Sequence, residues 1–200
     1  MRSSWRARKR EDTWVSKQIE DEHYSLEHLI PEVVEVARSY AGRKGIPVIA
    51  AGGIATGEDI ARFMALGASA VQMGSIFVPT EECDASVEFK QVYLNAHRED
   101  IRIIQSPVGM PGRAFDGEFI RNVAEGKEKP RSCPFHCIKT CDYTKSPYCI
   151  IKALYNAARG NMKKGYAFAG GNAYLSDRIR SVKEVIEKLK ADFFLSKALL

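Results

Sequence analysis

The 200-residue sequence lacks the features that mark membrane, secreted and disulfide-stabilised proteins. No apolar run approaches the roughly 20 residues that a membrane-spanning helix needs, so we expect a soluble protein with no membrane role. The N-terminus is basic but has no apolar stretch of the kind found in a secretory signal. Only five Cys are present, which fits thiols kept free in a reducing cytoplasm. These absences together predict a cytoplasmic protein.

The composition is that of a folded domain. Hydrophobic residues make up 45% of a 22.3 kDa chain, which is enough for one sizeable core. The net charge is +5, and residues 1–17 contribute six basic against two acidic side chains. A nucleic-acid-binding interpretation would therefore depend mainly on this opening stretch, and we expect no nucleic-acid partner for the rest.

Hydrophobic periodicity predicts alternating helices and strands in the first half of the chain. Thr56 stands as an N-cap, with Asp59 three residues later in the spacing of a capping box. Buried-strand runs that alternate with helices at this pitch indicate right-handed βαβ units and a parallel sheet. The predicted elements are a helix over 25–40, a strand over 46–54, a helix over 56–68, a strand over 68–78 and a helix over 84–97.

The second half is less regular. Residues 101–115 are expected to be partly extended and broken by Pro and Gly, and 133–149 to form a loop or short helix. A helix is predicted over 146–160, with Gly160 at its C-terminal cap. The amphipathic stretch 176–193 is expected to pack as a helix against the rest of the fold.

Both predicted strands end in glycine-containing turns, AAGGIATG at 50–57 and VQMGS at 71–75. Glycine lets backbone N–H groups approach an anion closely, and a helix N-terminus just beyond would add its dipole. Two such turns on neighbouring parallel strands would hold one phosphate, as on the last two strands of TIM barrels. The alternative is that each glycine only permits a tight turn for packing.

The stretch IPVIAAGGIATGEDIARFMALGASAVQMGSIFVPTEEC at 46–83 closely resembles the FMN-dependent nitronate monooxygenases and their relatives, the flavin-type enoyl-ACP reductases. YSLEHLIPEVVEV before it, and SPVGMPGRAF, CIKTCDYTKSPYCIIKALYNAARG and AGGNAY after it, extend the likeness over about 19–190. The resemblance implies an α/β fold, the C-terminal part of a TIM barrel with a helical C-terminal extension. It also implies an FMN cofactor, with contacts from Gly52, Gly53, Gln72, Met73, Gly74 and Ser75.

The implied activity is oxidation of a small nitronate with O₂, and the alternative is reduction of an enoyl thioester. In the family a Gly-Gly-His turn supplies the catalytic His, and nothing upstream of residue 19 matches it. His23 and His28 are not assigned to that role. We therefore expect this chain to lack the catalytic His. The expectation is a truncated chain that is inactive alone and self-associates through exposed sheet edges. A non-catalytic fragment or a basic-arm binding protein remains the third interpretation.

The opening stretch MRSSWRARKREDTWVS has no helical or strand period. Codons can be chosen for it that, read in a shifted frame, encode AVIVE followed by GPKAGGH, a strand leading into a Gly-Gly-His turn. We therefore interpret residues 1–18 as an out-of-frame or non-native segment. Residues 19–125 are then expected to form a partial flavin-binding barrel, and residues 126–200 a Cys-containing loop with a helical extension.

Four of the five Cys lie close together in the sequence, at 133, 137, 141 and 149, with His136 among them. The C-x3-C-x3-C spacing would place three thiols on one face of a helix, but zinc sites favour more closely spaced Cys pairs. We favour structural free thiols and predict no metal. The basic run GKEKPR at 126–131 is interpreted as a solvated loop, with a phosphate or acyl-carrier contact as the alternative.

Overall fold

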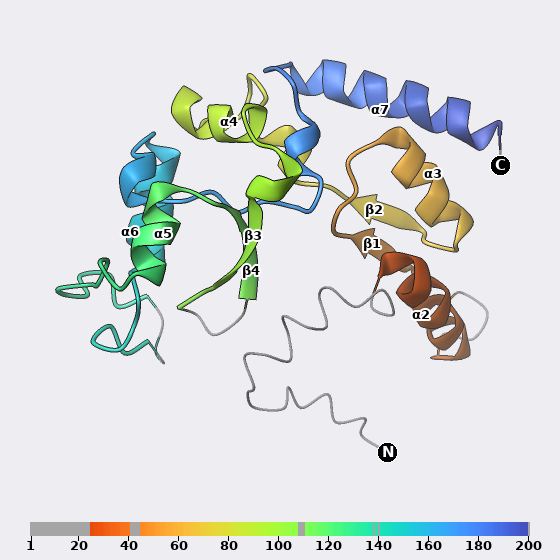
Figure 1. Ribbon diagram of the computed structural model, residues 1–200. Coiled ribbons are helices and arrows are strands. Elements are labelled where there is room, and N and C mark those ends of the chain that lie inside the picture. The colour runs from red at the N-terminus through yellow and green to blue at the C-terminus, as the bar shows by residue number, and fades with distance from the viewer. Residues whose placement is uncertain (1–24, 41–44, 108–110, 138, 140, 200) are drawn as a thin grey trace.

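The computed structural model is an α/β protein whose elements are described over residues 25–40, 45–107, 111–137, 139 and 141–199 (Figure 1). The segment 1–18 and His23 lie outside these residues. Helix α2 spans Leu26–Tyr40, as its periodicity predicted. No helix within the described residues is long and apolar enough to cross a membrane.

The first βαβ unit has the predicted order with shorter strands. Strand β1 spans Ile49–Ala51, helix α3 spans Gly57–Ala65 and strand β2 spans Ala70–Gln72. The two strands pair in parallel, with Ile49 opposite Ala70 and Ala51 opposite Gln72. The predicted continuation of the second strand through residue 78 is wrong, because the 3-10 helix η3 spans Ser75–Phe77 immediately after Gly74. Glycine turns therefore end both strands early.

Helix α3 begins with the predicted capping box. The Thr56 hydroxyl accepts a hydrogen bond from the backbone N–H of Asp59 at 3.0 Å. The Asp59 carboxylate in turn accepts from the N–H groups of Ala55 and Thr56 at 3.0 and 3.1 Å. The apolar faces of α2, β1 and α3 close over one core, made by Ile30, Val34, Ala50, Ile54, Phe63 and Ala68.

The second half begins with helix α4 at Val87–Leu94 and the 3-10 helix η4 at Arg98–Asp100. Strands β3, Ile101–Gln105, and β4, Pro111–Phe115, pair antiparallel as a hairpin, with Ile101 opposite Phe115. Helix α5 spans Glu118–Ala124 and helix α6 spans Ile150–Ala158. In Figure 1 the hairpin lies between the β1–β2 pair and these two helices.

A buried aromatic cluster joins the hairpin to α5 and α6. The rings of Phe119 and Tyr166 stack with centroids 6.1 Å apart, and Tyr148 meets both rings edge-on. The Tyr148 hydroxyl donates to the Tyr166 hydroxyl at 3.2 Å, so each buried phenol has a polar partner. The described residues between α5 and α6 form no helix or strand, and the GKEKPR stretch among them is mostly exposed, as predicted.

The chain then returns from α6 across the middle of the molecule (Figure 1). It passes through the 3-10 helices η5, Met162–Lys164, and η6, Ala173–Leu175, before helix α7 at Val182–Lys197. Helix α7 packs on α3, as expected of the amphipathic C-terminal stretch. Gly57 permits this contact, because a Cβ there would lie 2.4 Å from the carbonyl oxygen of Leu189 and from the amide nitrogen of Phe193.

Candidate functional site

The parallel register brings the two glycine turns to one edge of the sheet. Since Ala51 pairs with Gln72, the turn at Gly52–Gly53 and the turn at Met73–Gly74 leave their strands side by side. This is the carboxyl edge of the parallel pair, where α/β folds hold ligands. The juxtaposition that the sequence predicted for the two turns is therefore present.

The first turn has a backbone conformation that only glycine adopts readily. Gly52 has φ +112° and Gly53 has φ +68°. A Cβ on either residue would meet no atom within 4 Å, and the same holds at Gly74 in the second turn. Open space therefore faces the backbone of both turns, so packing against a neighbouring side chain does not explain these glycines.

The N-terminus of α3 is less available than the sequence suggested. Its Asp59 carboxylate already accepts the N–H groups of Ala55 and Thr56, and it places negative charge beside the first turn of the helix. Gly57 is buried against α7. The positive end of this helix dipole therefore already interacts with the Asp59 carboxylate. Anion binding at this edge would depend on the glycine turns themselves.

Ser75 provides a hydroxyl donor in the second turn. Its Oγ accepts a hydrogen bond from the backbone N–H of Gly170 at 2.9 Å. A hydroxyl carries one proton and two lone pairs, so Ser75 can still donate its own proton to a ligand. The side chain of Met73 instead packs against the core of α2, β1 and α3, so it would contribute its backbone alone. Gln72 is exposed at the end of β2.

A contact from far along the chain completes the edge. The side-chain amide of Asn172 donates from Nδ2 to the carbonyl oxygen of Gly53 at 2.5 Å, across 119 residues. Gly170 and Asn172 belong to the AGGN stretch at 169–172. The sequence resemblance included this stretch but implied no role for it. Its paired glycines after an alanine match the AGG of the first strand-end turn, which is the signal that could have identified it.

The geometry fits a phosphate group. Positive-φ glycines and open space at one turn, and a hydroxyl free to donate at the other, are the donor set that anion sites use. Asp59, the titratable side chain described near this edge, is committed to capping α3, so it is not assigned as an acid or base. Within the described part of the chain, His28 pairs with Ser25 (Oγ to Nδ1, 3.0 Å), His97 precedes η4, and His136 lies in the cysteine loop.

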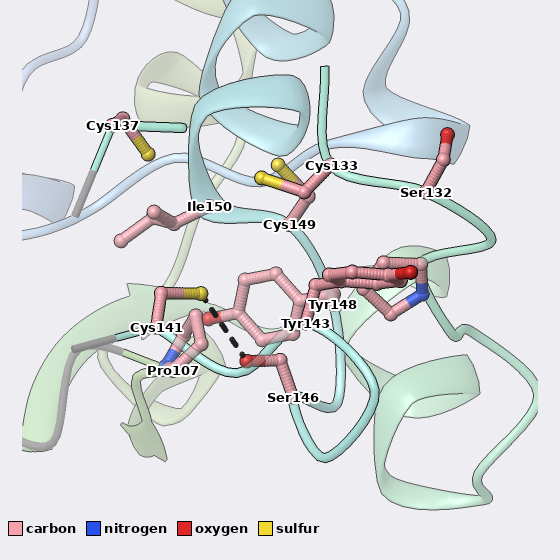
Figure 2. Close-up of a pocket in the computed structure, with 11 residues that line it drawn as sticks. Pro107, Ser132, Cys133, Cys137, Cys141, Tyr143, Ser146, Tyr148, Cys149 and Ile150 are labelled. Atoms are coloured by element: carbon pink, nitrogen blue, oxygen red, sulfur yellow. Dashed lines mark hydrogen bonds between the residues drawn. The ribbon is translucent and has the colours of Figure 1, made fainter. Parts of the chain in front are cut away.

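The cysteine-rich segment forms a separate pocket (Figure 2). The sulfurs do not lie on one helical face, because the described residues between α5 and α6 are not helical. Among the described residues no group of three or more His, Cys, Asp or Glu side chains is arranged to hold a metal ion. The Cys141 thiol lies 3.7 Å from the Ser146 hydroxyl. The lining includes Pro107, Cys133, Cys137, Cys141, Tyr148 and Cys149.

The sequence comparisons with known proteins all point to nitronate monooxygenases. A family model described as nitronate monooxygenase matches residues 15–192. The chain is 34% identical over 97 residues to a probable nitronate monooxygenase of Staphylococcus saprophyticus, covering 48% of this chain and 25% of that protein. It is 32% identical over 160 residues to a probable nitronate monooxygenase of Staphylococcus aureus (strain Newman), covering 80% and 43%. The chain thus spans less than half the length of these relatives.

The fold of this chain is also similar to those of solved structures. FabK from Thermotoga maritima is 29% identical with a TM-score of 0.67, covering 88% of this chain and 50% of that one. A nitroalkane oxidase from Streptomyces ansochromogenes has a TM-score of 0.64 at 23% identity, with coverage of 88% and 45%.

Proposed function

The chain belongs to the nitronate monooxygenase family, and from this premise we propose that it serves FMN-dependent oxidation of small alkyl nitronates by O₂. In this proposal the two glycine turns hold the phosphate of FMN. The chemistry that FMN supplies when bound is the acceptance of electrons from the nitronate and their transfer to O₂. The residues assigned to FMN are Gly52 and Gly53 in the first turn and Gln72, Met73, Gly74 and Ser75 in the second.

The observation that carries the proposal is the pairing of these turns at one strand edge. The backbone of Gly53 is open to an incoming group and held at φ +68°. The Ser75 hydroxyl, already accepting from Gly170, retains its proton for a phosphate oxygen. Hydrogen bonds to charged acceptors are stronger than neutral ones, so a few such donors suffice to orient a phosphate.

We further propose that residues 19–125 form part of a TIM barrel and that residues 126–200 extend it. The parallel β1–β2 pair supports this, as does the coverage of about half of the FabK chain. A barrel closes only with all eight strands. We therefore propose that the residues described here supply the phosphate end of the site, that the proton-abstracting group is contributed elsewhere, and that this part alone is inactive.

The alternative function is flavin-dependent reduction of an enoyl thioester. The likeness to FabK, one of the flavin-type enoyl-ACP reductases, favours it, since that structure is 29% identical over most of this chain. A further alternative is a non-catalytic role, such as binding through the basic opening stretch. Colourless, aggregated protein that takes up no FMN would support the non-catalytic interpretation.

The test begins with the binding of FMN to the purified chain, measured by the quenching of flavin fluorescence. Gly53→Ala should weaken binding, because an L residue at φ +68° costs roughly 1 kcal/mol and the added methyl enters the open space. Gly117→Ala is the matched control, since Gly117 has a negative φ and open surroundings outside the turns. Equal affinity of both variants would contradict the assignment of the turns.

The two activities are separated by two assays on FMN-loaded protein in which all eight barrel strands are present. O₂ uptake with propyl nitronate and no oxidation of NAD(P)H with crotonyl thioester would support the monooxygenase. The reverse result would support the reductase.

A further inference from the structure

A four-residue segment, Ala169–Asn172, contacts both glycine turns from a distant part of the chain. The backbone N–H of Gly170 donates to Ser75 Oγ at 2.9 Å, and Asn172 Nδ2 donates to the carbonyl oxygen of Gly53 at 2.5 Å. One short segment therefore links the end of β1 to the end of β2. We call it the 169–172 segment.

The 169–172 segment is anchored on its far side as well. The N–H of Ala169 donates to the carbonyl oxygen of Arg113 in β4 at 2.9 Å, and the hydroxyl of Tyr93 donates to the carbonyl oxygen of Phe168 at 2.6 Å. Ala173, which follows the segment, is 1% exposed and closes a turn onto the carbonyl oxygen of Gly170. The donors that reach the glycine turns are thus held by the core of the second half.

Gly170 must be glycine for this approach. A Cβ there would lie 2.9 Å from Ser75 Oγ, inside van der Waals contact. Removing that atom lets the backbone N–H reach the hydroxyl and occupy one of its lone pairs. The hydroxyl proton then cannot be donated to Gly170 and is left for another acceptor, such as a ligand oxygen.

The amide of Asn172 acts on the turn that contains two consecutive glycines. Gly52 and Gly53 lack a Cβ, so their backbone has more freedom than that of any other residue. The peptide group between Gly53 and Ile54 is planar, and its carbonyl and N–H point in opposite directions. A hydrogen bond that holds the Gly53 oxygen therefore also holds the direction of the Ile54 N–H.

We propose that Asn172 is a positioning residue for the anion site. It fixes the peptide plane after Gly53 so that the first turn is pre-organised to receive a phosphate, while Gly170 orients the Ser75 hydroxyl in the second turn. The inference rests on the proposed function for the identity of the ligand, a flavin phosphate. Pre-organisation of donors raises affinity because the ligand does not have to order them.

The test uses Asn172→Ala and Asn172→Leu in the full chain, each of which removes the amide donor without adding charge near the phosphate. The matched control is Asn156→Ala, since Asn156 makes the same kind of contact, from Nδ2 to the carbonyl oxygen of Lys164 at 3.0 Å, away from the turns. The probes are FMN and riboflavin, which differ by the phosphate. Loss of one hydrogen bond corresponds to about a fivefold change, so FMN binding should weaken about fivefold while riboflavin binding stays the same.

A second readout does not depend on flavin. Amide hydrogen exchange at residues 52–54 of the unliganded protein should speed up about fivefold in the Asn172 variants and remain unchanged in the Asn156 control. If the wild-type chain binds no FMN, the proposed function fails for this chain, and the exchange comparison alone decides whether Asn172 holds the turn. Unchanged exchange, or equal losses of FMN and riboflavin affinity, would overturn the role given to Asn172.

Discussion

At the scale of single residues, two glycines with opposite surroundings explain much of the local structure. Gly53 faces open space with φ +68°, so its backbone conformation alone requires glycine. Gly57 is buried, and the backbone of α7 occupies the space where its side chain would be. The first is available to a ligand, whereas the second is committed to packing.

Gly57→Ala should therefore destabilise the protein, although alanine is the better helix former. The added Cβ would lie 2.4 Å from backbone atoms of Leu189 and Phe193, and backbone cannot move aside as a flexible side chain can. We expect a loss of about 2–3 kcal/mol in the free energy of unfolding, measured by urea denaturation. Gly117→Ala, with open surroundings, should change it by less than about 1 kcal/mol. Equal effects of the two changes would refute the close approach of α3 and α7.

Tyr93 should make the stability fall in alkaline solution. Burial raises the pKa of its phenol well above the ordinary value near 10, and the charge of Cys83 raises it further. Below pH 10 the phenol is protonated in both states and its contribution is complete. Above pH 10 the unfolded chain releases the proton while the folded protein keeps it, so the free energy of unfolding falls.

Tyr93→Phe tests this at two pH values. At pH 8 it should cost about 1 kcal/mol, because the hydrogen bond to the Phe168 carbonyl is lost. Between pH 10 and pH 11.5 the variant should lose less stability than the wild type. If the free energy of unfolding, measured by urea denaturation, falls equally steeply with pH in the variant and the wild type over that range, Tyr93 does not titrate as described. The pKa values of Tyr148 and Tyr166 are also raised by burial, so some decline remains in the variant.

The five thiols should react at rates that follow their exposure. Cys137 and Cys141 are exposed, whereas Cys83, Cys133 and Cys149 are partly buried. A colorimetric disulfide reagent should modify two thiols quickly and three slowly in the native protein, and all five at one rate in denaturant. Peptide mapping would identify the fast pair, and fast reaction of Cys149 would contradict the burial of this pocket.

At the scale of elements, hydrogen bonds to the N–H groups of its first turn hold helix α7 in position. The Ser181 hydroxyl accepts from the N–H of Glu184 at 3.2 Å, and the Glu184 carboxylate accepts from the Ser181 N–H at 2.9 Å. The carboxylate of Glu82, from the loop after η3, accepts from Val182 N–H at 3.0 and 2.9 Å. Negative charge at this end complements the helix dipole and ties α7 to the loop beyond the second glycine turn.

Ser181→Ala should cost about 1 kcal/mol through loss of the cap. Thermal unfolding followed by circular dichroism would measure it, and the midpoint should fall by a few degrees. Ser196→Ala, in the last turn of the same helix, should leave the midpoint unchanged or raise it slightly, because alanine has the higher helix propensity. A cap that contributes nothing would leave both variants alike.

At the scale of the whole molecule, apolar side chains remain exposed around the first βαβ unit. Val36 on α2 is 56% exposed and Ile49 on β1 is 59% exposed, with Val33 and Ile46 also exposed nearby in the sequence. Among the described residues the β1–β2 sheet has two strands only, so each has an edge that is not paired. We propose that this face drives self-association when nothing else covers it.

Ile49→Lys combined with Val36→Lys should therefore reduce association. Sedimentation velocity over a tenfold concentration range should show larger species for the wild type and a smaller weight-average size for the double variant. Leu195→Lys, which changes an even more exposed apolar residue on α7, is the control. Equal sedimentation of the two variants would place the contact elsewhere.

The interpretation of residues 1–18 as an out-of-frame segment stays a prediction, since these residues lie outside those described. The DNA sequence across these codons would test it. An in-frame Gly-Gly-His turn joined by one inserted or deleted base would support it, whereas codons incompatible with that reading would refute it.

The sequence by itself determined the elements whose signals are local. The helix at Leu26–Tyr40 follows from periodicity, and the capping box of Thr56 and Asp59 from short-range hydrogen bonding. The parallel pairing of the two strands follows from their alternation with a helix. Strand lengths were overestimated, because an apolar run does not show how many of its residues pair with a neighbouring strand. The two glycine turns were found because glycine itself is the signal.

Only the tertiary structure decided what completes the site. The approach of Gly170 to Ser75 and of Asn172 to Gly53 joins residues 95 and 119 positions apart, and no local pattern encodes such a contact. The use of Asp59 to satisfy its own helix, and the burial of Gly57 under α7, likewise depend on packing. The physical reason is that backbone conformation is set within a few residues, whereas the partners of a hydrogen bond are set by how the whole chain folds back on itself.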